Sequence, residues 1–220
     1  MEIMFPGLDA DAHRRIAAVI HYPIHVDRGE HLVRSGDRFH DLYSVHDGVF
    51  KAYVDDANGR EHVWGFNVQG ELMGLHAITT GHYQANFVAL EPSRVAAIPY
   101  SQLLTLLDQI PPLFDFLMRA ASGRLGILER LSGDHAAQVR MAAFLVSLPR
   151  RFQRLTHAPG TFRLPMSRRD VANYLRLVPE TVSRMFSRFV REGLIRVDGQ
   201  DITLLQLARL EEIGKPLGEL

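Results

Sequence analysis

In residues 165–199 the apolar positions recur at helical spacing, and this pattern predicts two short amphipathic helices joined by a tight turn. Ser167 followed by Asp170 is an N-cap signal, because the hydroxyl can accept from a backbone amide and the acid lies in the positive first turn. Pro179 opens the second helix at its first position, where its missing N–H costs nothing, and Gly193 ends it. The predicted apolar faces are Val171, Ala172, Tyr174 and Leu175 in the first helix, and Val182, Met185, Phe186 and Phe189 in the second.

A β-hairpin follows the second helix. Residues 194–197 and 202–204 are β-prone, and they flank Asp198-Gly199, a dipeptide typical of tight turns. A helix, the turn at residues 176–178, a second helix and a hairpin are, in this order, the parts of a winged helix-turn-helix.

The outward face of the second helix offers the side chains that a DNA reader needs. Glu180, Ser183 and Arg184 have the spacing i, i+3, i+4, so they share one face at the helix N-terminus, the end that reaches base edges. Arg184 can donate twice to guanine, Glu180 can accept from a base amino group, and Ser183 can reach a base edge or a phosphate. The alternative is a helix pair whose charged face is merely solvated; the agreement of cap, turn, helix and wing favours the DNA reader.

The run Glu180-Thr-Val-Ser-Arg184, preceded by Leu-Pro-Met-Ser-Arg-Arg-Asp-Val-Ala-Asn-Tyr-Leu, resembles the DNA-binding domain of the CRP/FNR family of bacterial transcription regulators, on the FNR side. In FNR-like members the E-x-x-S-R motif reads a TTGAT-type half-site, which implies the same role for Glu180, Ser183 and Arg184. Phosphate contacts are expected from Ser167, Arg168, Arg169, Thr181 and Arg188.

Two positions depart from the family pattern. Arg176 stands where the family often has Gly, so the turn is expected to differ slightly. Val178 replaces a frequent Thr cap, and Pro179 is expected to compensate in part.

Residues 22–99 show short β-prone runs with turn signals about every 8–12 residues, which predicts an antiparallel β-roll or barrel. Asn58-Gly59 is the clearest hairpin tip, and a short helix is expected before the roll, at residues 9–19. The runs are residues 23–26, 30–33, 41–45, 50–54, 63–68, 87–90 and 95–98.

The β-rich region also resembles the effector domain of this family. Cyclic-nucleotide-binding members hold the ribose and phosphate with a Gly-Glu pair and an Arg about ten residues later. Gly70-Glu71 is present, but residues 81–86 hold no cation, and a buried phosphate without one is costly. We therefore reject cyclic AMP as ligand and expect Glu71 to be structural.

The chain has no cysteine, which excludes disulfides and the four-cysteine iron–sulfur cluster of FNR; Ala96 aligns with one of its ligands. Haem or metal ligation by histidine stays open, although no H-x-x-H or H-x₃-H pair lies on a predicted helix and no metal site is expected. A haem- or small-molecule-dependent sensor of the same family is therefore the alternative function. The eleven histidines are residues 13, 21, 25, 31, 40, 46, 62, 76, 82, 135 and 157.

Helices are expected at residues 101–107, 112–131 and 135–154. Steps of 3 or 4 along the longest one suit a two-stranded coiled coil, the dimer interface of the family. The alternative is a helix packed only on its own domain. The dimer is favoured because a helix-turn-helix protein gains specificity by binding two DNA half-sites. The interface residues expected are Phe114, Leu117, Ala121, Leu125, Leu128 and Leu131.

The predicted architecture is α+β: a β-roll effector domain at residues 1–110, a dimerisation helix at 111–133 and a winged helix-turn-helix at 134–220, with the hinge at 131–135. Net charge is zero, but residues 1–110 carry eight basic against 14 acidic side chains, and residues 163–199 carry eight against four. The basic region suits phosphates. No catalytic motif, signal peptide or apolar run of 18 residues is seen, so we expect a cytoplasmic, non-enzymatic homodimer whose partners are DNA and RNA polymerase.

Overall fold

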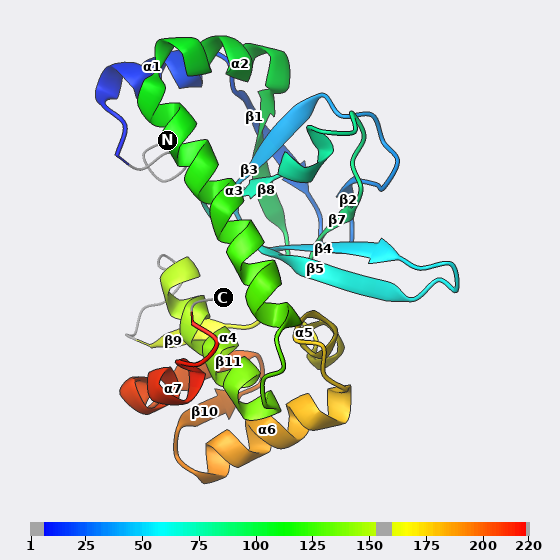
Figure 1. Ribbon diagram of the computed structural model, residues 1–220, viewed down its shortest axis with the longest axis vertical. Coiled ribbons are helices and arrows are strands. Elements are labelled where there is room, and N and C mark those ends of the chain that lie inside the picture. Colours follow the sequence, from blue (N-terminus) through cyan, green and yellow to red (C-terminus); the bar gives the residue numbers. More distant parts are fainter. Residues whose placement is uncertain (1–6, 153–159, 219–220) are drawn as a thin grey trace. The chain divides into compact units, whose positions relative to one another are not determined.

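The computed structural model describes residues 7–152 and 160–218 (Figure 1). Residues 1–6, where no signal peptide is expected, lie outside the described residues. So do residues 153–159, most of the loop before the helix-turn-helix. The chain divides into two compact units, Met1–Gly123 and Arg124–Leu220, each described by itself below. The division falls inside helix α3 (Pro111–Ser132), not at the expected hinge.

The first unit is built on two four-stranded sheets whose strand pairs are all antiparallel, with the orders β1-β8-β3-β6 and β2-β7-β4-β5. This is the arrangement that the seven β-prone runs predicted, with the two-residue strand β6 added. The strands are β1 (His21–Val26), β2 (His31–Val33), β3 (Asp41–Asp47), β4 (Phe50–Asp55), β5 (Glu61–Asn67), β6 (Leu72–Met73), β7 (Asn86–Ala89) and β8 (Ser93–Pro99), and a 3₁₀ turn, η1 (Leu75–Ala77), follows β6.

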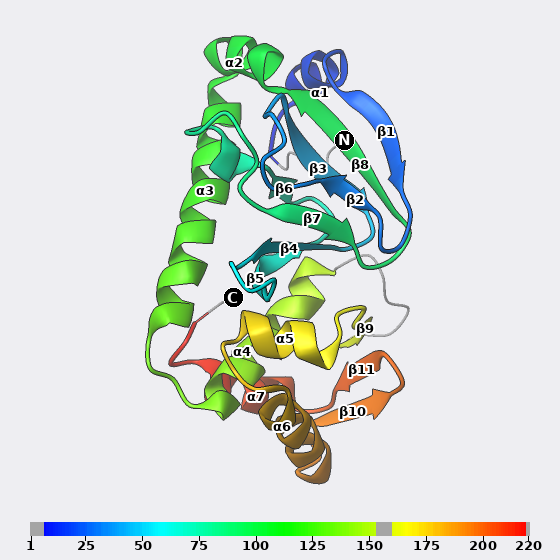
Figure 2. The same cartoon turned by 90° about the vertical axis from the view of Figure 1, so that its right-hand side faces the viewer.

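Two hydrophobic clusters hold the first unit together. One lies between the two sheets and includes Phe50 and Phe87 from one sheet and Val45 and Val95 from the other. The second covers the outer side of β3 and β8 with the helices α1 (Ala10–Ala17) and α2 (Tyr100–Gln109) and the first turns of α3. Figure 2 shows α1 and α2 at the end of this sheet.

The packing of α3 corrects part of the expected dimer interface. Leu117 belongs to the cluster that covers β3 and β8 and is 7% exposed, and Leu131 is 4% exposed, so both are buried within the chain. The apolar side chains that α3 leaves exposed follow a 4, 3, 4, 3 spacing if the half-buried Ala121 is included. This apolar stripe consists of Phe114 (54% exposed), Met118 (48%), Ala121, Leu125 (63%) and Leu128 (50%).

The second unit contains the last turns of α3 and the predicted helix-turn-helix with its wing. The wing is a three-stranded antiparallel sheet of order β10-β11-β9. Strand β9 and helix α7 were not expected from the sequence. The elements are α4 (Ala137–Arg151), β9 (Thr161–Arg163), α5 (Arg168–Tyr174), α6 (Pro179–Arg191), β10 (Ile195–Asp198), β11 (Asp201–Leu204) and α7 (Leu207–Gly214).

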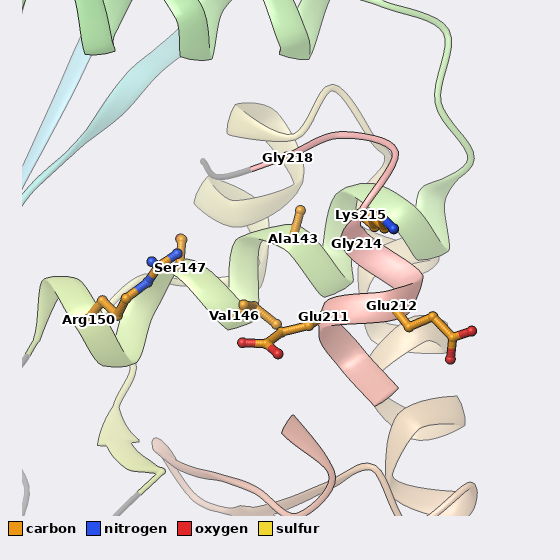
Figure 3. A pocket seen from close by; sticks show the side chains of 9 residues that line it. All are labelled: Ala143, Val146, Ser147, Arg150, Glu211, Glu212, Gly214, Lys215 and Gly218. Atoms are coloured by element: carbon orange, nitrogen blue, oxygen red, sulfur yellow. The ribbon is translucent and has the colours of Figure 1, made fainter. Parts of the chain in front are cut away.

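Gly214 lets α7 pack tightly against α4. A Cβ atom at this position would lie 2.8 Å from the backbone nitrogen of Ala143, so only glycine allows the approach (Figure 3). An open groove of about 420 Å³ lies beside this contact and is lined by Arg150 and Lys215 together with Glu211 and Glu212, so no single sign of charge selects a ligand there.

Candidate DNA-reading surface

Helix α5 begins at the N-cap that the sequence predicts, and Ser167 and Asp170 form a capping box there. The Ser167 hydroxyl accepts from the Asp170 backbone N–H at 3.0 Å, and the Asp170 carboxylate accepts from the Ser167 N–H at 3.3 Å. Reciprocal bonds of this kind satisfy two backbone donors that the first turn leaves open. The start of α5 is therefore fixed by its own side chains.

The turn between α5 and α6 has the left-handed residue that the family pattern suggests. Arg176, which stands in place of a frequent Gly, has a φ of 54° and is the non-glycine residue with positive φ among the described residues. The Leu177 N–H then bonds the Ala172 carbonyl at 2.8 Å. Val178 is the N-cap of α6 without a side-chain bond, and Pro179 follows at the first helical position.

Helix α6 separates its apolar and polar side chains onto two faces. Val182, Phe186 and Phe189 are 0%, 5% and 0% exposed and pack inward. Glu180 and Arg184 are exposed on the other side. Because these side chains lie at the N-terminal end of a helix, a DNA major groove could receive them.

Two of the side chains that are expected to read bases form hydrogen bonds within α6. The Ser183 hydroxyl donates to the Pro179 carbonyl at 3.0 Å, and the Arg184 guanidinium donates to the Thr181 hydroxyl at 3.1 Å. Both bonds are exposed, so water or a base edge can replace them at little cost. The expected trio of Glu180, Ser183 and Arg184 therefore shares one surface with its donors and acceptors available.

The expected phosphate contacts differ in how they are placed. Arg169 is exposed beside the start of α5, while Thr181 is half-buried. The Arg188 guanidinium pairs with Glu192 at 2.6 Å, and the Ser167 hydroxyl is 2.6 Å from the Asp170 carboxylate. Of this set, Arg169 is the side chain best placed to meet a phosphate.

Arg168 makes a contact that the sequence did not predict. Its guanidinium carbon lies 3.2 Å from the ring centroid of Phe186, a cation–π arrangement that joins α5 to α6. Burial lowers the pKa of this guanidinium. Arg168 therefore takes part in the packing of the two helices, and its contact with a phosphate stays a prediction.

The wing adds a basic side chain that the sequence reasoning did not single out. Arg196 of β10 is exposed opposite Thr203 of β11, between the inward-facing Ile195 and Val197. This alternation is visible in the sequence and could have identified Arg196. Asp198 and Asp201 are exposed at the hairpin end, which makes the tip itself a poor partner for phosphates.

Glu71 and Ala96, the two positions compared above with effector-binding residues of the family, are both part of the packing of the first unit. The Glu71 carboxylate accepts from the Val68 backbone N–H at 3.2 Å, and Ala96 is fully buried in β8. Within the described ranges, no group of three or more His, Cys, Asp or Glu is arranged to hold a metal ion. Nor does any described helix have the length and hydropathy needed to cross a membrane.

Comparison with known proteins shows which domain families the two units match. Residues 139–213 match the Crp-like helix-turn-helix domain family, and residues 23–110 match the cyclic nucleotide-binding domain family. The chain is 38% identical over 183 residues to the fumarate nitrate reduction regulatory protein of Klebsiella oxytoca, a match covering 81% of this chain and 73% of that protein. The corresponding regulator of Escherichia coli K12 is 37% identical over the same shares.

Solved structures show the same fold. FixK2 from Bradyrhizobium japonicum superimposes with a TM-score of 0.77 and 26% identity, covering 87% of this chain and 96% of that one. TTHA1359 from Thermus thermophilus, a CRP/FNR-family regulator, gives a TM-score of 0.66 over 90% of this chain and 100% of that one, at 21% identity. The names of the relatives at 37% and 38% identity describe regulatory proteins. This chain belongs to the CRP/FNR family of DNA-binding transcriptional regulators.

Proposed function

We propose that this regulator binds DNA as a homodimer and reads a palindrome of TTGAT-like half-sites. The observation that carries the proposal is the N-terminal end of α6, where Glu180, Ser183 and Arg184 are exposed together above a buried apolar face. Arg184 donates to guanine O6 and N7, Glu180 accepts from a base amino group, and Ser183 contacts a base edge or phosphate. Arg169 and Arg196 contact phosphates on either side.

The apolar stripe on α3 supports the dimer. Its 4, 3, 4, 3 spacing is that of a coiled-coil seam, and a second copy of the chain is the partner whose stripe matches it by symmetry. A two-fold axis along this seam relates two α6 helices, which then meet half-sites about 34–36 Å apart. A dimer of this kind acts in the cytoplasm on RNA polymerase at its target promoters, without an enzymatic step of its own.

We also propose that DNA binding needs neither cyclic AMP nor an iron–sulfur cluster. Residues 81–86 offer no cation for a phosphate diester, the Glu71 carboxylate already accepts a backbone bond, and the chain has no cysteine. The alternative function is a sensor of the same family that binds DNA only with a ligand, and haem is the cofactor that stays open for it. An optical spectrum of the purified protein distinguishes the two, because bound haem gives a Soret band.

The test is to select preferred DNA sites from a random pool in aerobic buffer, using the full-length protein without added ligand. The proposal predicts dyad-symmetric sites with TTGAT-like arms. Repeating the selection with cyclic AMP or with haem should return the same sites with the same affinity. Sites without dyad symmetry would contradict the dimeric reader, and binding that appears only with an added ligand would contradict ligand independence.

A further inference from the structure

Arg140 of α4 is a buried arginine that binds backbone carbonyls. It is 8% exposed, and every hydrogen bond that its guanidinium makes to described residues ends on a main-chain oxygen. Nε donates to His135 at 3.0 Å, Nη2 donates to Gly133 at 2.6 Å, and Nη1 donates to Leu131 at 3.0 Å and to Leu175 at 3.2 Å. The other buried charged side chain among the described residues, Lys51, has the Glu61 carboxylate 2.6 Å away.

The acceptors come from the ends of two helices. Leu131 lies in the last turn of α3, Gly133 and His135 lie in the link to α4, and Leu175 is the C-cap of α5. Carbonyls at a helix C-terminus lack intrahelical donors and form the negative end of the helix dipole. A guanidinium suits them, because it carries five N–H donors in a rigid planar fork and keeps its charge when buried.

Leu175 has a particular need for this donor. If α5 continued, its carbonyl would accept from the N–H of the residue four positions later, but that residue is Pro179, which has no N–H. The chain then turns through Arg176 at a φ of 54° before α6 begins. The guanidinium of Arg140 is thus anchored at the turn that starts the reading helix.

We propose that Arg140 is a positioning residue that sets the angle between the last turn of α3 and the helix-turn-helix, and thereby the distance between the two α6 helices of the dimer. The inference rests on the proposed homodimer. All the atoms involved lie in the second unit. Because α3 carries the apolar stripe, a rotation of the helix-turn-helix about the end of α3 changes the separation of the two reading helices.

A purely structural role for Arg140 predicts lower stability and nothing specific on DNA. A positioning role predicts a change in the half-site spacing that the dimer prefers, with the base preference of each half-site intact. Arg140→Lys separates the two, because it keeps the charge but one ammonium cannot serve four carbonyls as the planar fork does. Arg140→Met removes the charge at similar length. Arg150, an exposed arginine on the same helix, provides matched controls in Arg150→Lys and Arg150→Met.

The experiment measures the affinity of full-length protein for one half-site and for palindromes whose half-site separation changes in single base-pair steps around one helical turn. Wild type should prefer one spacing by about tenfold or more, the size of effect that one charge-assisted hydrogen bond can carry. Arg140→Lys and Arg140→Met should bind the single half-site like wild type but spread their preference over neighbouring spacings, to about threefold or less. The Arg150 variants should keep the wild-type profile.

Each remaining outcome overturns the inference. If Arg140→Lys keeps the wild-type spacing profile, the guanidinium does not set the separation. If both Arg140 variants fail to fold, as judged by circular dichroism and thermal unfolding, Arg140 holds the domain together and does not position it. If wild type itself shows no spacing preference, the homodimer on a palindrome fails, and that failure is visible before any variant is measured.

Discussion

The two four-stranded sheets of the first unit and the outer face of α6 use polar side chains in opposite ways. In the sheets, polar groups find partners on other strands of the same sheet: Lys51 pairs with Glu61 at 2.6 Å, and the His31 ring nitrogen lies 2.9 Å from the Tyr53 hydroxyl. On α6, the partner of the exposed Arg184 guanidinium is the hydroxyl of the half-buried Thr181, one turn away.

This difference separates charge that serves the fold from charge that serves binding. A buried ammonium such as that of Lys51 is tolerated because the chain provides a carboxylate, and its loss is felt in stability. An exposed guanidinium such as that of Arg184 contributes little to stability, since water satisfies it as well. The partner that we propose for it is a base edge of DNA. The apolar stripe on α3 follows the same logic, because no described residue buries its Phe114, Met118, Leu125 or Leu128.

The largest expected effect concerns this stripe. Leu125→Asp should abolish dimerisation, because pairing would then bring two carboxylates together in an apolar interface at a cost of several kcal/mol. The monomer should stay folded, since Leu125 is 63% exposed within the chain. Sedimentation and DNA binding in aerobic buffer measure both. Ser122→Asp, an exposed position beside the stripe, is the control and should leave the dimer intact; a dimeric Leu125→Asp protein would remove the stripe from the interface.

The sheets should respond in stability alone. Glu61→Gln removes the carboxylate next to the buried Lys51 ammonium and should lower the free energy of unfolding by about 1–3 kcal/mol, without changing the selected DNA site. Asp47→Asn disrupts an ion pair with Arg94 whose side chains are 45% and 43% exposed, and should cost less than about 0.5 kcal/mol. Equal losses in the two variants, measured by denaturant unfolding, would show that burial does not distinguish them.

Two neighbouring arginines on α5 test the same contrast at close range. Arg169→Met should weaken binding to all sequences and reduce the slope of log affinity against log salt by about 1, as the loss of one phosphate contact does. Arg168→Met should leave that slope unchanged and lower stability by about 0.5–1 kcal/mol, the value of a cation–π contact with Phe186. A reduced slope for Arg168→Met would return this residue to the phosphate contacts.

A small stabilising effect is expected at the N-cap of α6. Val178 already has the extended backbone of a cap, with φ −89° and ψ 150°, but no side-chain oxygen to accept from the first turn. Val178→Thr should raise the free energy of unfolding by about 0.5–1 kcal/mol, and Val178→Ala, which adds no hydroxyl, should not. Because Val178 is 57% exposed, neither change removes core packing. Equal stabilities of the Thr and Ala variants would show that no cap bond forms.

The helix-turn-helix was predictable because its signals are local. The Ser167–Asp170 capping box, the proline at the start of α6 and the glycine after it each act within a few residues, and all appear in the structure. The exposure of the apolar side chains of α3 was not predictable in the same way, because it depends on tertiary packing. Leu117 has the spacing of an interface residue, yet α1 and α2 cover that face of α3.

Long-range pairing explains two further misses. Strand β9 is three residues long and is defined by its pairing with β11, about 40 residues later, which no local pattern reveals. The contact of Arg168 was missed for a related reason: its spacing fits a phosphate contact, but its guanidinium also packs on Phe186 of the next helix.

The base preference of Arg184→Ala tests the central claim most directly. Wild-type and variant proteins are used to select sites from the same random pool, and affinities are measured for the wild-type site and for versions changed at each base pair. The account predicts that Arg184→Ala lowers affinity by about 1–3 kcal/mol and relaxes the preference at one G·C pair of each half-site, leaving the other positions and the folding stability unchanged. If the preference at every base pair stays as in wild type, the outer face of α6 does not read DNA through Arg184.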